Sequence, residues 1–271
     1  GPRIGRRDRV GGRVGLSTMA VFPDGCARAF AMAAELGYDG VEVMVWSDPV
    51  SQDADALLKL STEYGLDVLS VHAPTTLLTQ AVWGRDPWAK LVRSAEHAEA
   101  LGAGVVVVHP PFRWQRTYGA GFTEGIAELG DNHHTLFAVE NMFPWRAGGA
   151  ELEAYSPGWD PRQQPYEHLT LDFSHAATAR MDSLELAKDL GGRLAHVHLA
   201  DGSGSLKDEH LAPGRGNQPC DRVLSLLADI EWGGHVIAEV NTRRDPARRT
   251  STLAETLVFA RTHLRQSGPR Q

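Results

Sequence analysis

The stretch LGAGVVVVHPP, residues 101–111, contains the unit that decides the fold of this 271-residue chain. Gly102 follows a helical pattern and is typical of a helix C-cap. Val105–His109 is a short β-rich run, which indicates a strand. The run ends on a polar, metal-capable side chain, His109. The unit is therefore a helix, a glycine turn, a strand and a polar residue at the strand end.

The same unit repeats along the chain, and glycine also follows the helical patterns at Leu36-Gly37 and Tyr64-Gly65. Eight β-rich runs are present: Val14–Ser17, Gly40–Val45, Val68–His72, Val105–His109, Thr135–Asn141, Leu169–Phe173, Leu194–Leu199 and Val236–Val240. Amphipathic stretches with helical spacing lie between them, among them Cys26–Leu36, Ala54–Tyr64, Trp88–Leu101, Ser183–Leu190, Arg222–Leu227 and Ala247–Leu264.

Strands that alternate with helices indicate a parallel sheet, and eight such units in roughly 260 residues indicate a closed barrel. No G-x-G-x-x-G motif follows the first strand, which argues against a dinucleotide-binding fold. We therefore predict an α/β fold, a single (β/α)₈ TIM barrel over residues 13–265. Residues 1–12 and 266–271 are expected to be flexible tails.

Composition excludes several classes of protein. The net charge is −7, so the chain lacks the positive field of a general nucleic-acid binder, and duplex DNA is disfavoured as a partner. No apolar run approaches the roughly 20 residues that span a bilayer, so no membrane association is expected. Cys26 and Cys220 are too few for a disulfide framework and suit a reducing compartment, which predicts a cytoplasmic protein.

Polar side chains end six successive strands, from the third to the eighth. Their motifs are SVHAP, VVVVHPP, VEN, LDFSH, HVHLAD and IAEVN. The residues are His72, His109, Glu140, Asp172, His198 and Glu239. Strand alternation places His196 and His198 both inside the barrel, with His196 one layer deeper as a polar filler.

Burying this many ionisable groups around one barrel mouth costs several kcal/mol apiece unless they are paired or bind metal. Six in register therefore indicate a metal site. Mixed nitrogen and oxygen ligands favour Zn²⁺, Mn²⁺ or Fe²⁺ over Ca²⁺.

Three further residues extend this set. His175 follows Asp172 in LDFSH. Two long connections, Met142–His168 and Ala200–Pro219, follow strands and so lie on the catalytic face of a barrel. The second carries Asp208 and His210, an Asp-x-His pair that can hold an ion, between glycines that let the backbone fold over the mouth.

With these residues in place, the chain resembles the xylose-isomerase-like TIM-barrel superfamily from about Val14 to Leu264. The motifs GVE, SVHAP, VVVHPP, VEN, LDFSH and HVHLAD, then KDEH with PGRG, match in order and spacing. The superfamily includes sugar-phosphate isomerases and epimerases, inosose-processing enzymes, hydroxypyruvate isomerases and endonuclease IV.

The resemblance implies two ligand sets. The single-metal set of the isomerases corresponds to Glu140, Asp172, His198 and Glu239. Endonuclease IV has a three-metal set, and this sequence supplies a candidate for each of its nine ligands, with DEH at 208–210 where DRH is usual. The nine are His72, His109, Glu140, Asp172, His175, His198, Asp208, His210 and Glu239. Up to three divalent ions per chain are therefore expected.

The resemblance and its two ligand sets imply two alternative reaction classes. In a sugar or sugar-phosphate isomerase/epimerase, Glu140 and Glu239 would be the catalytic pair that moves a proton next to a carbonyl. In an endonuclease IV-like phosphoester hydrolase, clustered metals would generate hydroxide. The full ligand set favours the hydrolase, but APTTLLTQAVWG stands where endonuclease IV has an asparagine- and tyrosine-containing loop. A multi-iron oxidase and a metabolite-binding barrel without activity are weaker alternatives. We adopt the isomerase/epimerase.

Other residues near the strand ends are candidates for binding a small anionic or sugar-like substrate. Arginine forks suit phosphate or carboxylate, and a tryptophan can line an apolar wall for a sugar face. Glu42, in GVE, resembles the isomerase branch. The candidates are Glu42, Trp46, Arg146, Arg215 and Arg243. The oligomeric state stays open.

Overall fold

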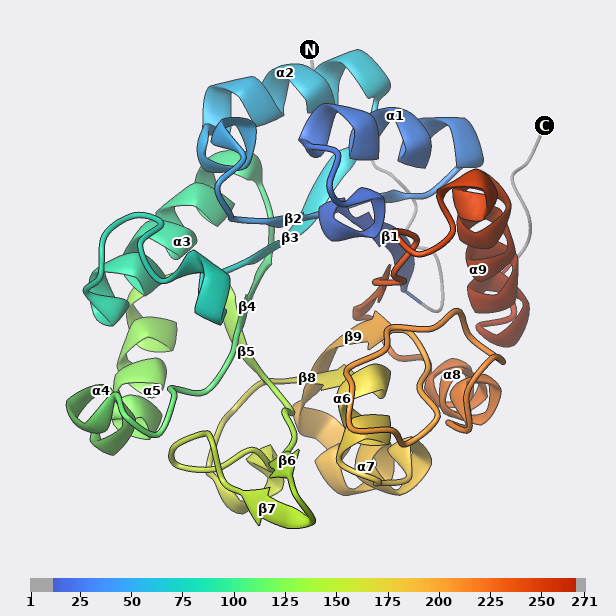
Figure 1. The fold of residues 1–271 in the computed structure, drawn as a ribbon. Helices are drawn as coiled ribbons and strands as arrows, with labels where there is room; N and C mark the ends of the chain where they lie inside the picture. Colours follow the sequence, from blue (N-terminus) through green and yellow to red (C-terminus); the bar gives the residue numbers. More distant parts are fainter. Residues whose placement is uncertain (1–11, 267–271) are drawn as a thin grey trace.

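Parallel strands form a closed barrel in the computed structural model, which describes residues 12–266 (Figure 1). Within this range eight strands close the barrel in the order β1, β2, β3, β4, β5, β8, β9 and β10. Their bounds are β1 Arg13–Ser17, β2 Gly40–Met44, β3 Asp67–His72, β4 Val105–Val108, β5 Leu136–Glu140, β8 Leu169–Asp172, β9 Leu194–Leu199 and β10 His235–Ala238. The prediction of a single (β/α)₈ TIM barrel is confirmed.

Helices surround the barrel (Figure 1). They are α1 Cys26–Leu36, α2 Ala54–Tyr64, α3 Pro87–Leu101, α4 Arg116–Ala120, α5 Phe122–Asn132, α6 Phe173–Thr178, α7 Ser183–Leu190, α8 Cys220–Asp229 and α9 Arg249–His263. Gly37, Gly65 and Gly102 end α1, α2 and α3 with left-handed φ values of 89°, 64° and 72°. Glycine stands there because a side chain would strain that conformation.

Strand alternation separates the outer core from the barrel interior. Val106 and Val108 of β4 belong to the main core, which packs the barrel against its helices. Val105 and Val107 instead form a separate cluster with Ala138 of β5. Since side chains alternate along a strand, His109 continues the inward series of Val105 and Val107. The polar strand ends therefore face the interior at the carboxyl end of the barrel.

The connection between β5 and β8 contains an antiparallel hairpin that the sequence pattern did not predict. Its strands are β6 (Trp145–Ala147) and β7 (Ala150–Leu152), and Figure 1 draws the hairpin at the periphery of the barrel. The hairpin matters for function because Trp145 reaches the cleft described below.

The tails expected at residues 1–12 and 266–271 lie outside the described residues, apart from Gly12 and Gln266 at their inner ends. Within residues 12–266, no helix has the combination of length and apolar character that crossing a membrane requires. Cys26 and Cys220 are both free and buried.

Candidate metal centre

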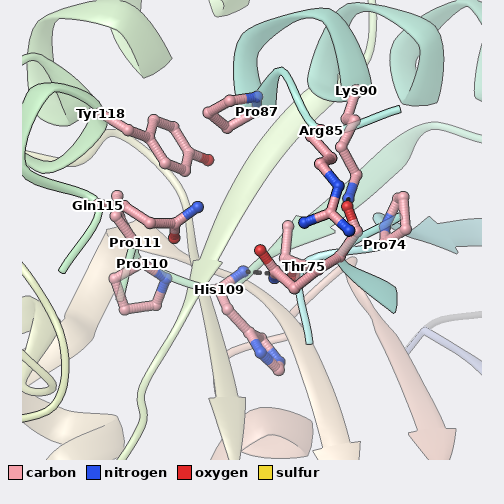
Figure 2. A pocket seen from close by; sticks show the side chains of 11 residues that line it. Pro74, Thr75, Arg85, Pro87, Lys90, His109, Pro110, Pro111, Gln115 and Tyr118 are labelled. Carbon is pink, nitrogen blue, oxygen red and sulfur yellow. Dashed lines mark hydrogen bonds between the residues drawn. The ribbon is translucent and has the colours of Figure 1, made fainter. Parts of the chain in front are cut away.

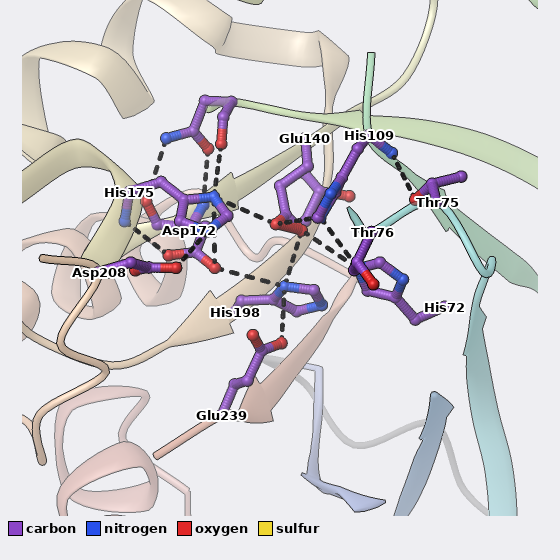
Figure 3. A network of polar contacts seen from close by, with 12 residues as sticks. His72, Thr75, Thr76, His109, Glu140, Asp172, His175, His198, Asp208 and Glu239 are labelled. Atoms are coloured by element: carbon purple, nitrogen blue, oxygen red, sulfur yellow. Dashed lines mark hydrogen bonds and ion pairs between the residues drawn. The ribbon is translucent and has the colours of Figure 1, made fainter. Parts of the chain in front are cut away.

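The metal-capable side chains of the strand ends converge at the carboxyl end of the barrel (Figure 3). Register explains part of this arrangement, because Asp172 of β8 lies beside His198 of β9 in the sheet. Figure 3 shows His72 and His109 on one side of Glu140, and His175 and Asp208 on the other. The structure thus brings together residues from six strand ends, helix α6 and one loop.

Four side chains form the middle of the network. His198 Nδ1 lies 3.0 Å from Glu140 Oε2, 3.0 Å from Glu239 Oε2 and 3.7 Å from Asp172 Oδ2. The side chains of Glu140, Asp172 and His198 are at most 1% exposed, and that of Glu239 is 16% exposed. These are the four residues that the isomerase resemblance assigns to a single metal.

The same four atoms, Glu140 Oε2, Asp172 Oδ2, His198 Nδ1 and Glu239 Oε2, have no hydrogen-bond partner among the described residues. Their contacts with one another, at 3.0–3.7 Å from His198 Nδ1, are ion pairs that require a protonated His198. A divalent cation coordinated by these atoms would take the place of that proton and give all four atoms a partner. The donor set therefore fits a bound metal ion.

A second group lies beside Glu140. His109 Nε2 is 3.2 Å from both His72 Nε2 and Glu140 Oε1, and His72 Nε2 is 3.9 Å from Glu140 Oε2. Two imidazole nitrogens and one carboxylate within this range could hold another ion. Glu140 would then bridge two positions, one through each oxygen.

A third group lies on the other side of the network. Asp208 Oδ2 is 3.0 Å from His175 Nε2 and 2.9 Å from His210 Nε2. His175 stands in the first turn of α6, where the carboxylate of Asp172 caps the helix by accepting from the His175 backbone N–H at 2.9 Å. Ser174 Oγ donates to Asp208 Oδ1 at 2.6 Å and accepts from the backbone N–H of His210 at 2.9 Å. The helix therefore anchors both loop ligands.

The loop that carries Asp208 and His210 is closed by one buried carboxylate. Asp201 accepts from the backbone N–H groups of Gly202, Gly214 and Gln218 at 2.8–3.0 Å. The backbones of Asp201 and Leu211 also exchange two hydrogen bonds, at 2.8 and 2.9 Å. Asp201 thus fixes both ends of the loop.

We expect Asp201→Ala to loosen this loop and weaken the third group alone. The substitution removes three hydrogen bonds to a charged acceptor, each worth roughly 1.5–3 kcal/mol. Elemental analysis should find fewer bound ions per chain than in the wild type, while far-ultraviolet circular dichroism stays unchanged. An unaltered metal content would show that the loop ligands hold no ion or do not need Asp201.

The carboxylates and histidines of the network shift one another's pKa values. Burial alone would lower the pKa of His198 and His210, but the surrounding carboxylates raise the first well above its ordinary value and the second to about 10. Burial raises the pKa of Glu239 to about 8, with help from nearby Asp172 and Glu140 and against the effect of the histidines. In return, the histidines hold the pKa of Glu140 and Asp208 well below their ordinary values. A bound cation would take the place of the histidine protons, because only a neutral imidazole nitrogen can coordinate a metal.

Glu42 lies beneath this network, not beside the cleft. Its Oε1 accepts from His196 Nε2 at 2.7 Å and from Ser70 Oγ at 2.8 Å, and its Oε2 lies 2.8 Å from His198 Nε2. Burial would raise the pKa of Glu42, but His198 and His196 hold it well below its usual value. Glu42 is fully buried and one layer below His72, since the sheet register pairs it with Ser70. This differs from the expected contact with substrate.

The placement of Glu42 matches that of a carboxylate that orients a metal-binding histidine. With Nε2 of His198 facing Glu42, Nδ1 is left to face the other three ligands. We expect Glu42→Gln to weaken metal binding about 10- to 100-fold, the usual effect of losing such a partner. Competition with a chromophoric chelator would measure it. Affinity equal to that of the wild type would contradict this role.

A cleft of about 590 Å³ opens beside the network, and its polar lining includes three of the candidate ligands, His109, His175 and Asp208. Much of its wall is apolar. On the β1 and β2 side the wall consists of Met19, Phe22, Met44 and Trp46. On the β4 and β5 side it consists of Phe112, Met142, Phe143, Trp145 and Tyr155, and the connection after β3 adds Leu77 and Leu78. Most of the β5 part of this wall belongs to an irregular connection, where strand alternation gives no side-chain direction.

The residues predicted to bind substrate do not all lie at the cleft. Trp46 lines the cleft, but none of the three predicted arginines is among the described residues that do so. Arg146 donates to the carbonyl of Thr178 at 2.5 Å. Arg215 lies 3.8 Å from Glu255 on the surface, and the guanidinium of Arg243 stacks on the ring of Phe22, 5.2 Å from its centre.

A separate small pocket lies behind His109 and contains two cations that the cleft lacks, Arg85 and Lys90 (Figure 2). Its volume of about 20 Å³ has room for roughly one water molecule. Lys90 is buried and donates to the carbonyls of Thr79 and Gln80 at 2.9 and 3.0 Å. This pocket shares only His109 with the cleft.

The chain matches a known protein family and curated relatives over most of its length. The family model for the xylose isomerase-like TIM barrel matches residues 30–262. An uncharacterized protein of Mycobacterium tuberculosis (strain H37Rv) is 50% identical over 273 residues, which cover 93% of this chain and 98% of the relative.

Two solved structures share the fold at lower identity. D-allulose 3-epimerase from Methylomonas sp., in complex with D-allulose, is 17% identical, with a TM-score of 0.63 and coverage of 94% of this chain and 98% of that one. AP endonuclease, family 2, from Brucella melitensis is 21% identical, with a TM-score of 0.66 and coverage of 92% and 99%.

Proposed function

The chain belongs to the xylose isomerase-like TIM-barrel family, and on this premise we propose that it is a divalent-metal-dependent sugar or sugar-phosphate isomerase or epimerase. One observation carries the proposal. Four buried ligand atoms, on Glu140, Asp172, His198 and Glu239, converge without hydrogen-bond partners. They lie next to an open cleft whose lining includes neighbouring members of the same network. The sugar complex of the Methylomonas epimerase supports a sugar-like substrate.

These four residues would hold the metal ion of the reaction. The groups around His109 and His210 offer positions for up to two more. Nitrogen and oxygen donors suit Zn²⁺ or Mn²⁺, and Fe²⁺ as well. When bound, the ion would polarise the carbonyl and hydroxyl oxygens of the substrate. It would so acidify the C–H bond of the hydroxyl-bearing carbon next to the carbonyl.

Glu140 and Glu239 would move the proton. One carboxylate takes a proton from the carbon next to the carbonyl. Its return to the former carbonyl carbon, with transfer of the hydroxyl proton from one oxygen to the other, gives an isomer. Delivery of a proton to the opposite face of the same carbon gives an epimer. Glu239 is the more accessible of the two, since its side chain is 16% exposed whereas that of Glu140 is 1% exposed.

The alternative is multi-metal phosphoester hydrolysis of the endonuclease IV type. The three adjacent ligand groups favour it, since two or three ions can stabilise the attacking and leaving oxygens. The apolar cleft and the net charge of −7 disfavour duplex DNA as the substrate.

The experiment that separates the two reactions runs both on the metal-loaded protein. In D₂O, a panel of ketoses, aldoses and their phosphates should incorporate deuterium next to the carbonyl, as followed by NMR. An oligonucleotide with an abasic site should stay intact. Strand cleavage that is lost in Glu140→Gln, without deuterium incorporation in any sugar, would replace the isomerase with the hydrolase.

A further inference from the structure

We infer that the substrate is a neutral polyol that carries an apolar group, either an aryl or an alkyl substituent. This group binds the apolar wall of the cleft. The wall residues concerned are Trp46, Leu77, Leu78, Phe112 and Trp145. The inference rests on the proposed function, because it concerns the substrate of the same site.

The size and chemistry of the cleft give the first reason. Its volume of about 590 Å³ lies within the range of roughly 300–1,000 Å³ that is typical of sites for drug-sized ligands. A polyol needs hydrogen-bond partners, yet much of the wall consists of aromatic, leucine and methionine side chains. A polar sugar at the metal centre would therefore leave a large part of the apolar wall without a matching surface.

Exposed apolar side chains at the rim give the second reason. Leu77 and Leu78, in the connection after β3, are 51% and 95% exposed. Across the cleft, Trp114 is 56% exposed and stacks on Phe112, with ring centres 4.7 Å apart and planes inclined by 1°. Single exposed apolar residues are common, but here they continue the apolar wall, and such a patch marks a binding site. Covering the wall with an apolar group would remove this surface from water.

The distribution of charge gives the third reason. Among the described residues that line the cleft, the only acidic or basic side chains are those of His109, His175 and Asp208, all candidate metal ligands. Phosphate groups are usually bound by arginine or lysine. Arg85 and Lys90 lie in the separate pocket behind His109 (Figure 2). Thus no arginine or lysine is among the described residues that line the wall, and Arg243 instead stacks on the ring of Phe22.

The test uses two fluorescent compounds with the same anilinonaphthalene skeleton on the Mn²⁺-loaded protein. N-phenyl-1-naphthylamine is neutral, and 8-anilinonaphthalene-1-sulfonate adds one negative charge. We expect saturable binding of the neutral compound, at least tenfold tighter than that of the sulfonate. The double variant Leu77→Gln/Leu78→Gln should weaken the neutral compound at least fivefold. Ile230→Gln, at a 59% exposed position outside the cleft lining, should bind as the wild type does.

Three results would overturn the inference: no saturable binding of the neutral compound, equal binding of the sulfonate, or no difference between the double variant and Ile230→Gln. The readout is binding alone, so it is independent of the deuterium exchange that tests the proposed function. Exchange into sugar phosphates without binding of the neutral compound would refute the apolar substituent and leave the isomerase intact. Binding of the neutral compound without deuterium exchange into any sugar would refute the isomerase and leave the apolar binding site intact.

Discussion

Glu140→Gln is expected to reduce the rate of proton exchange by about 10³-fold or more, which is the scale of losing a catalytic acid or base. Glu140 contacts all three parts of the network. Its Oε1 is 3.2 Å from both His109 Nε2 and His175 Nδ1, and its Oε2 is 3.0 Å from His198 Nδ1. Glutamine keeps the shape of the side chain but removes its charge, so metal binding should fall together with activity. Deuterium incorporation and elemental analysis would measure the two effects.

Glu209→Gln provides a matched control for this variant. Glu209 lies on the mouth loop, and its Oε1 accepts from the hydroxyl and backbone N–H of Ser203 at 2.7 and 2.8 Å, outside the ligand network. Its activity should stay close to that of the wild type. Full metal content together with full activity in Glu140→Gln would refute the assigned role of Glu140.

Glu239→Gln is expected to lower kcat by about 10²- to 10⁴-fold while the protein still binds metal at the flanking groups. Glu239 touches fewer of the other ligands. Its Oε2 lies 3.0 Å from His198 Nδ1, and its Oε1 lies 3.6 Å from His210 Nδ1. The chemical step should therefore suffer more than the assembly of the site. Retention of wild-type kcat would exclude Glu239 from proton transfer.

In the metal-free protein, we expect Glu239→Gln also to change how the free energy of unfolding depends on pH. Burial raises the pKa of Glu239 from an ordinary value near 4.5 to about 8. Between these values the folded state binds more protons than the unfolded state, so this carboxyl group destabilises the fold progressively as pH rises from about 4.5 to 8. Chemical denaturation should find that the advantage of the variant over the wild type grows across that window. A constant difference would mean that Glu239 is already ionised in the metal-free fold.

Much of the candidate centre was predictable because strand period and barrel closure act together. Side chains two apart on a strand share a face, and the carboxyl ends of all barrel strands meet at one mouth. Strand alternation and the shared mouth of the barrel together predict that His109, Glu140, Asp172 and His198 lie close to one another. His175 was harder, because it lies in the first turn of α6, where strand alternation does not apply, and the cap formed by Asp172 fixes that turn.

Two features depended on information that the sequence pattern lacks. The depth of Glu42 is set by its pairing with Ser70, next to a register shift at Val41/Glu42, and strand alternation gives only the face. The directions of Arg146 and Arg243 depend on loop conformation, which has no periodicity to read. Trp46 was expected in an apolar wall, but the full extent of the wall was not, since several separate connections assemble it.

We expect a divalent ion among Glu140, Asp172, His198 and Glu239, and the sharpest test is anomalous diffraction from crystals of the Zn²⁺-loaded protein. A strong peak should lie within coordination distance of Glu140 Oε2, Asp172 Oδ2, His198 Nδ1 and Glu239 Oε2, with zinc–nitrogen and zinc–oxygen distances of about 2.0–2.2 Å. Further peaks beside His109 and His210 would establish a cluster. The absence of a peak among those four atoms, at full zinc loading, would refute this metal site.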